Sequence, residues 1–168
     1  ELLYLGGLVA SAEEGMARIR NAREDGSGAE YFDRMVAALG GPANLVEHWD
    51  HHLEKAAVIV PVMPEQSGYL VKMDAREIGL ALVQLGGGRT RADQKIDYAV
   101  GFENFANLNE YVSQQQPIAF VHARTKSGAE KAILNILKAC VIAEEPEKNI
   151  QSNCVYDRIA LDQDVEED

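Results

Sequence analysis

The chain has 168 residues, of which 46% are hydrophobic and 26% charged, enough for one ordinary domain or two small ones. This composition is typical of a globular protein and argues against wholesale disorder. The formal net charge of −11 argues against nucleic acid or an anionic membrane as the main partner, because a polyanion would be repelled. The longest apolar run, Ala56–Met63, is too short to span a bilayer. Cys140 and Cys154 favour free thiols in a reducing cytoplasm over a disulfide framework.

Helical patterns fill the first 50 or so residues. Ser11 and Glu14 have the spacing of a capping box, and the helix that they begin is expected to end at Asp25-Gly26. Ser27 and Glu30 repeat the box ahead of a second helix. Its apolar face is formed by Phe32, Met35, Val36 and Leu39.

Gly40-Gly41-Pro42 is expected to end this second helix and to open a short third one, with the proline in its first turn. The chain opens with ELLYLGGL and not with Met, as if cut inside a helix. We therefore expect a piece of a longer protein, whose preceding part would cover the apolar helical faces.

The pattern changes at about Ala56. Val58–Val62 predicts a strand that lies at an edge or bends, because Pro61 interrupts it, and Gly68–Met73 predicts a second strand. Asp74 and Glu77 predict a capped helix that ends at Gly86-Gly87-Gly88. Its expected buried stripe consists of Ile78, Ala81, Leu82 and Leu85.

The remaining elements alternate irregularly. A loop at Arg89–Lys95 precedes an expected strand at Ile96–Phe102, and a polar stretch leads to another at Pro117–His122. Ser127 and Glu130 are expected to cap a helix. Its predicted apolar face consists of Ile133, Leu134, Leu137, Cys140 and Val141. A charged loop, Glu144–Ser152, and a last short strand, Cys154–Ile159, complete the prediction.

Strands and helices that mix without regular alternation favour an α+β fold. We divide the chain into a helical part with a linker at 1–55, an α+β domain at 56–160 and an acidic tail at 161–168, which we expect to be disordered.

Three histidines, His48, His51 and His52, flank Asp50 at the end of the third expected helix. His48 and His52 have the i, i+4 spacing that can chelate zinc or nickel, but the sequence nominates no third and fourth ligand. The alternative is a polar helix end beside Trp49, and we predict no metal site.

The run from Gly86 to Arg91, GGGRTR, contains residue types that bind phosphate. The glycines follow a helix, however, so the negative end of the helix dipole faces them. A helix stop is the favoured interpretation. Neither the dinucleotide-binding glycine fingerprint nor the P-loop pattern occurs.

Lys72-Met73 is similar to the lysine-methionine pair that carries biotin in swinging-arm domains, but here it ends a strand instead of forming a hairpin tip. His122 is interpreted as a core-edge histidine with a hydrogen-bond partner, the alternative being a catalytic one. No serine, cysteine or carboxylate has a context that marks a nucleophile. We therefore assign no catalytic, cofactor-binding or metal residue and expect no cofactor.

Two long segments nevertheless resemble a known family. GMARIRNAREDGSGAEYFDRMVAALGGP, then EQSGYLVKMDAREIGLALVQLGGGRTRADQKIDYAVGF and QPIAFVHA, are similar to the thymidine phosphorylases of the bacterial type and to the related pyrimidine-nucleoside phosphorylases. The resemblance runs from about Glu1 to Ile159. The stretch Leu108–Val112, with Gln114–Gln116, departs from the turn expected there.

The resemblance implies the C-terminal portion of an enzyme that cleaves thymidine or deoxyuridine with phosphate. Residues 1–55 would be the last helices of an α/β domain, and the rest would be similar to a barrel-sandwich hybrid with flanking helices. The family's Lys-His-Ser-Thr phosphate segment is missing from this sequence. The implied partners are the preceding part of the enzyme and, for the whole enzyme, a second copy. The alternative is a free-standing binding or carrier module.

Overall fold

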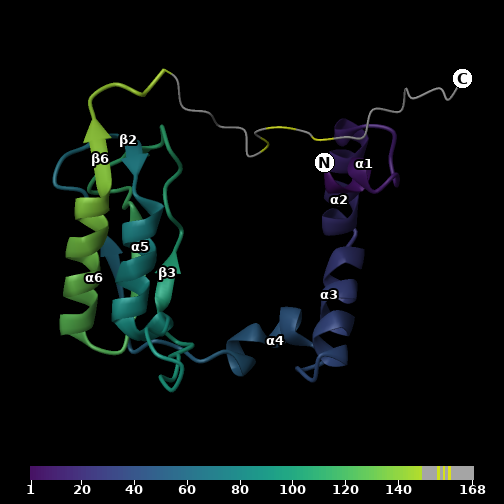
Figure 1. Ribbon diagram of the computed structural model, residues 1–168, viewed down its shortest axis with the longest axis horizontal. Coiled ribbons are helices and arrows are strands. Elements are labelled where there is room, and N and C mark those ends of the chain that lie inside the picture. Colours follow the sequence, from purple (N-terminus) through teal and green to yellow (C-terminus); the bar gives the residue numbers. More distant parts are fainter. Residues whose placement is uncertain (149–154, 156, 158, 160–168) are drawn as a thin grey trace, which may run out of the picture. The chain divides into compact units, whose positions relative to one another are not determined.

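The computed structural model describes residues 1–148 together with Val155, Asp157 and Ile159. The chain divides into two compact units, and the second begins at Ala56. The predicted acidic tail, 161–168, lies outside the described residues. The helices and strands, labelled in Figure 1, are α1 Leu2–Leu5, α2 Ala12–Glu24, α3 Ser27–Ala38, α4 Leu45–His52, β1 Val58–Val62, β2 Gly68–Met73, α5 Ala75–Leu82, the π-helical turn η1 Val83–Gly87, β3 Gly101–Glu103, β4 Tyr111–Val112, β5 Ala119–Ala123, α6 Lys126–Ala139 and β6 Cys140–Ala143.

The first unit consists of the helices α1 to α4. The predicted cap of α2 is confirmed, since the Ser11 hydroxyl accepts a hydrogen bond from the Glu14 amide at 3.2 Å. The Glu14 carboxylate in turn accepts from the Ala10 amide at 2.8 Å. Gly26 follows α2 with φ at 82°, the left-handed conformation that glycine adopts without strain.

The prediction that Ser27 and Glu30 form the capping box of α3 is wrong. Ser27 is the first residue of α3, and its hydroxyl donates to the Ala22 carbonyl at 3.5 Å. Gly26 is the N-cap and has no side chain that could accept a hydrogen bond, and the Asp25 carboxylate before it accepts from the Ser27 amide at 2.9 Å. The third helix also begins later than predicted, at Leu45.

Apolar side chains of the first unit remain largely uncovered. Val9 is the one buried hydrophobic residue among residues 1–55, all of which the structure describes. The predicted face of α3 is open to solvent together with parts of α1 and α2. Its exposed members and those of the neighbouring helices are Leu2, Leu5, Met16, Ile19, Phe32, Met35 and Leu39.

The second unit contains two three-stranded antiparallel sheets, ordered β1-β5-β3 and β4-β2-β6. The prediction of an edge strand at Val58–Val62 is confirmed: β1 lies at an edge, with Pro61 opposite Phe120. Proline is tolerated there because an edge strand leaves half of its amides without a ladder partner. The fold is α+β, as predicted.

Two strand predictions need correction. Ile96–Phe102 shortens to Gly101–Glu103, because the Asp97 carboxylate accepts from the Ala99 amide at 3.0 Å and turns the chain there. Cys140 and Val141, expected on a helix, begin strand β6, which pairs with the end of β2. Half of the strand expected at 154–159 lies outside the described residues, and the other three residues, Val155, Asp157 and Ile159, are not in a strand.

Helix α6 is capped by Thr125 and not by Ser127, since the Thr125 hydroxyl accepts from the Gly128 amide at 3.0 Å. Its buried residues are Ala129, Ala132, Ile136 and Ala139. The predicted face is partly correct, because Ile133, Leu137 and Cys140 pack against the core, whereas Leu134 is exposed. The small alanines allow α6 to approach α5 and the strands closely, and Figure 1 shows α5 and α6 side by side.

The core of the second unit is continuous. It consists of Val62, Leu70, Ala106, Val112, Ile118, Ala119, Val121, Ala123, Ala129, Ala132 and Ile136.

None of the described helices is long and apolar enough to cross a membrane.

Candidate functional site

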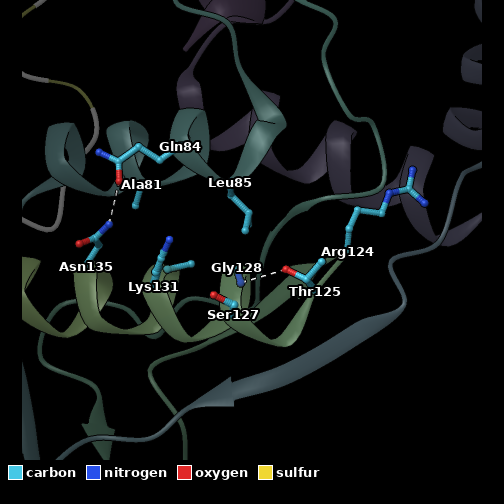
Figure 2. Close-up of a pocket in the computed structure, with 10 residues that line it drawn as sticks. Ala81, Gln84, Leu85, Arg124, Thr125, Ser127, Gly128, Lys131 and Asn135 are labelled. Carbon is cyan, nitrogen blue, oxygen red and sulfur yellow. Dashed lines mark hydrogen bonds between the residues drawn. The ribbon is translucent and has the colours of Figure 1, made fainter.

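An open groove between α5 and α6 is the candidate site of the second unit (Figure 2). Its volume is about 400 Å³. The groove is lined by Ala81, Gln84, Leu85, Arg124, Thr125, Ser127, Gly128, Lys131, Ala132 and Asn135. Ala81 and Ala132 are almost fully buried and form its apolar floor.

The walls of the groove are polar. Across one end the Asn135 amide donates to the Gln84 side-chain carbonyl at 3.1 Å, and this hydrogen bond links the two helices. Ser127 and Lys131 project from α6. Its lining residues include no carboxylate, histidine or cysteine, and these are the side chains that most often act as general acids, general bases or activated nucleophiles.

Arg124 stands at the rim and points away from the groove floor in Figure 2. Its guanidinium forms a bidentate pair with Asp97, with Nε donating to Oδ2 and Nη2 to Oδ1, both at 2.8 Å. These hydrogen bonds, followed by the one from the Ala99 amide, hold the pKa of the Asp97 carboxyl below its ordinary value. Sequence reasoning missed this pair, because the two residues are 27 positions apart and no local pattern joins them.

The glycine run ends the helical segment, as predicted, but α5 itself ends at Leu82 and the glycines end the turn η1 that follows it. Gly86 has φ at 106°, and the chain leaves the helix through the wider turn η1, which the sequence did not predict. The polar residues after it bond to one another: Arg91 Nη2 donates to Asp93 at 2.8 Å and the Thr90 amide to Gln94 at 3.0 Å. They do not line the groove.

The histidines of α4 are not arranged as a metal site. His48 has non-helical angles, φ −123° and ψ 29°, which disturb the i, i+4 spacing to His52. The His48 and His51 rings stack with centroids 5.9 Å apart, and His52 Nε2 lies 3.2 Å from the Asn44 side-chain oxygen. Among the described residues, no group of three or more histidine, cysteine, aspartate or glutamate side chains is placed to hold a metal ion.

The other residues considered from the sequence are His122, Lys72 and Cys140. His122 Nε2 lies 2.7 Å from the Glu103 carboxylate on the neighbouring strand, so the prediction of a histidine with a partner is confirmed. Lys72 lies within β2 opposite Val141 and not at a hairpin tip. The Cys140 thiol is free, and burial raises its pKa.

Comparison with known proteins defines the class. Residues 69–143 match the pyrimidine nucleoside phosphorylase C-terminal domain, which covers strand β2 through strand β6. This match confirms the sequence resemblance to the pyrimidine-nucleoside phosphorylases for that part of the chain.

The similar proteins are thymidine phosphorylases. Those of Burkholderia cenocepacia (strain HI2424) and Burkholderia orbicola (strain AU 1054) are each 44% identical over 147 residues, which is 88% of this chain and 34% of the relative. That of Burkholderia lata is 44% identical over 144 residues, 86% of this chain and 33% of the relative. The similarity thus extends beyond the matched domain, while the chain spans about a third of the length of these relatives.

Proposed function

We propose that this chain is the C-terminal region of a thymidine phosphorylase and that it supports the enzyme without supplying its catalytic residues. The observation that carries the proposal is the 44% identity over 88% of the chain to proteins named thymidine phosphorylase. The whole enzyme would convert thymidine and phosphate to thymine and 2-deoxyribose 1-phosphate, a pentosyl transfer in pyrimidine salvage, in the cytoplasm.

The residues of the groove agree with a supporting role that leaves catalysis to another part of the enzyme. Phosphorolysis requires hydrogen-bond donors aimed at phosphate and at the charge that develops on the departing base. The groove between α5 and α6 has one lysine and an arginine directed to Asp97, and this acidic chain lacks the Lys-His-Ser-Thr segment. The catalytic groups would therefore belong to another part of the enzyme.

The architecture supports finer proposals. The two small sheets of the second unit suit a domain similar to a barrel-sandwich hybrid. The helices of the first unit, with their uncovered apolar faces, suit the last part of an α/β domain. Their partner would then be the rest of that domain in the same enzyme, and the whole enzyme would be a homodimer.

A chimera tests the proposal. This chain would replace the homologous third of the Burkholderia cenocepacia thymidine phosphorylase, and thymine release from thymidine and phosphate would be measured by absorbance. We expect the chimera to be active and the 168-residue chain alone to be inactive. A folded but inactive chimera, or turnover by the chain alone above that of a matched blank preparation, would refute it.

The alternative of a carrier module finds no support in the position of Lys72, since a lysine within a central strand is not presented to a modifying ligase as one at a hairpin tip would be. An unmodified intact mass after coexpression with biotin and lipoyl ligases would agree with the phosphorylase assignment.

A further inference from the structure

The connection from Gly88 to Val100 contains no helix or strand, although it joins η1 to β3. Its tip is folded on itself. Thr90 donates to the Gln94 side chain through both its amide and its hydroxyl, at 3.0 and 3.2 Å, and Arg91 pairs with Asp93. We refer to residues 88–96 as the tip loop.

One residue closes the base of the tip loop. The Asp97 amide donates to the Gly86 carbonyl at 2.9 Å, and its carboxylate accepts from the Ala99 amide at 3.0 Å and from Arg124. Asp97 thus joins the last turn of η1, the turn before β3 and the junction between β5 and α6. These are three segments that are distant in sequence.

The Gly86 backbone is part of the same arrangement. Its φ of 106° lies in the left-handed region, which directs its carbonyl to the Asp97 amide and would strain any other residue. A Cβ at this position would lie 3.7 Å from the Asp97 Cβ, so the two backbones run close together.

We propose that Asp97 and Arg124 form a clamp, and that opening the clamp releases the tip loop as a unit while the sheets and the α5–α6 pair stay folded. The core cluster includes no residue of the tip loop, so its release exposes none of that core. The clamp itself is reached by solvent, with 47% of the Arg124 side chain and 27% of the Asp97 side chain exposed. Contacts of this kind open at lower free energy than a buried core.

The clamp also connects the loop to the groove. Arg124 lines the groove rim, and its bond to Asp97 holds the guanidinium away from the floor. When the clamp opens, the loop gains freedom and Arg124 loses this bond to Asp97. The tip loop and a residue that lines the groove are therefore connected through one ion pair.

Trypsin provides a direct test, because the tip loop contains Arg89, Arg91 and Lys95. The 168-residue chain and its Asp97→Asn variant would be digested under native conditions, and the initial cleavage rate in the loop measured by peptide mass. We expect Asp97→Asn to raise this rate roughly two- to five-fold, the range of an exposed ion pair. The matched control, Asp93→Asn, removes the Arg91 pair at the tip and leaves the clamp intact, so its cleavage after Arg89 and Lys95 should stay near that of the parent.

Two further measurements separate a clamp from general weakening. Amide exchange should increase in residues 88–100 of Asp97→Asn and remain unchanged in β2 and α6. Arg124→Gln should also raise the rate, and the increase in the double variant should be smaller than the product of the two single increases, because both substitutions remove the same ion pair. Parental cleavage rates in Asp97→Asn, or an equal increase of exchange in β2 and α6, would overturn the proposal.

Discussion

The two units of this chain use apolar residues in opposite ways. In the second unit, Leu70, Ile118 and Ile136 are completely buried and belong to one core. In the first, Met16, Ile19 and Met35 are each more than half exposed, although they follow a helical periodicity as Ile136 does in α6. Periodicity therefore indicates which face of a helix is apolar, whereas burial depends on a second surface that covers it.

The second unit supplies that surface itself. Helix α6 packs on the neighbouring strand β5 and also on β1 and α5, which are distant in sequence. The helices α1 to α4 contact mainly their neighbours along the chain. The difference predicts that substitutions of the same kind have unequal effects in the two units.

Isoleucine truncation should give the largest difference. Ile136→Ala removes a fully buried side chain and should destabilise the second unit by about 2–5 kcal/mol, because a cavity remains in the core. Ile19→Ala, in α2, should cost less than about 1 kcal/mol. Urea unfolding followed by circular dichroism, with amide exchange to assign the transition, measures both. Equal costs would mean that the first unit has a core of its own.

Glycine substitution is the next test. A Cβ on Gly68 would lie 2.5 Å from the Ala143 carbonyl oxygen and 2.8 Å from Ile142 Cγ2, so Gly68→Ala must separate β2 from β6 and should cost about 1–3 kcal/mol. Gly79, in α5, has open space around its Cβ position, and Gly79→Ala should stabilise by about 0.4–1 kcal/mol. Thermal melts of the two variants measure whether each substitution raises or lowers the stability. A stabilising Gly68→Ala would show that β2 and β6 do not pack as described.

Local patterns predicted much of this structure from the sequence. The strand at Gly68–Met73 and the caps at Ser11 and Asp74 were predicted correctly, because alternation and capping depend on neighbours within four residues. The Thr125 cap was missed because Ser127 and Glu130 offered a competing box two residues later.

Long-range contacts account for the rest. Strand β6 was expected to be helical, since its residues continue the apolar period of α6, and pairing with β2 decides otherwise. The bend at Asp97 depends on Gly86, Ala99 and Arg124, and no pattern in Ile96–Phe102 announces it. The groove likewise combines α5 with α6, which separate stretches of sequence could not reveal.

Removal of a helix cap should have a smaller effect. Asp74 accepts hydrogen bonds from the Arg76 and Glu77 amides, both at 3.1 Å, and Asp74→Ala should lower the stability of the second unit by about 1 kcal/mol. Ser11→Ala should speed amide exchange in α2 and leave the unfolding midpoint of the second unit unchanged. A shift of that midpoint by Ser11→Ala would indicate that the two units unfold together.

Titration of one aspartate in each unit should give the smallest effect. The Ser27 amide lowers the pKa of Asp25, and Arg124 followed by the Ala99 amide lowers that of Asp97. A lowered folded-state pKa means that the stabilisation is complete above the unfolded value of about 3.9 and is lost as pH falls through the folded value. Between pH 7 and pH 5 we therefore expect the stability of both turns to stay constant. Below about pH 4, protonation of Asp25 and Asp97 should destabilise both turns.

Carbon-detected NMR of the aspartate carboxyls measures the two pKa values directly, and both should fall below the ordinary value of about 3.9. Arg124→Gln provides the matched control: it should raise the pKa of Asp97 and leave that of Asp25 unchanged, since only Asp97 bonds to Arg124 among these two. An Asp97 pKa that Arg124→Gln does not move would show that the Ala99 amide, and not the ion pair, holds the carboxylate. In that case the bend before β3 would be a local turn, as independent of the core as the cap at Asp25 is in the first unit.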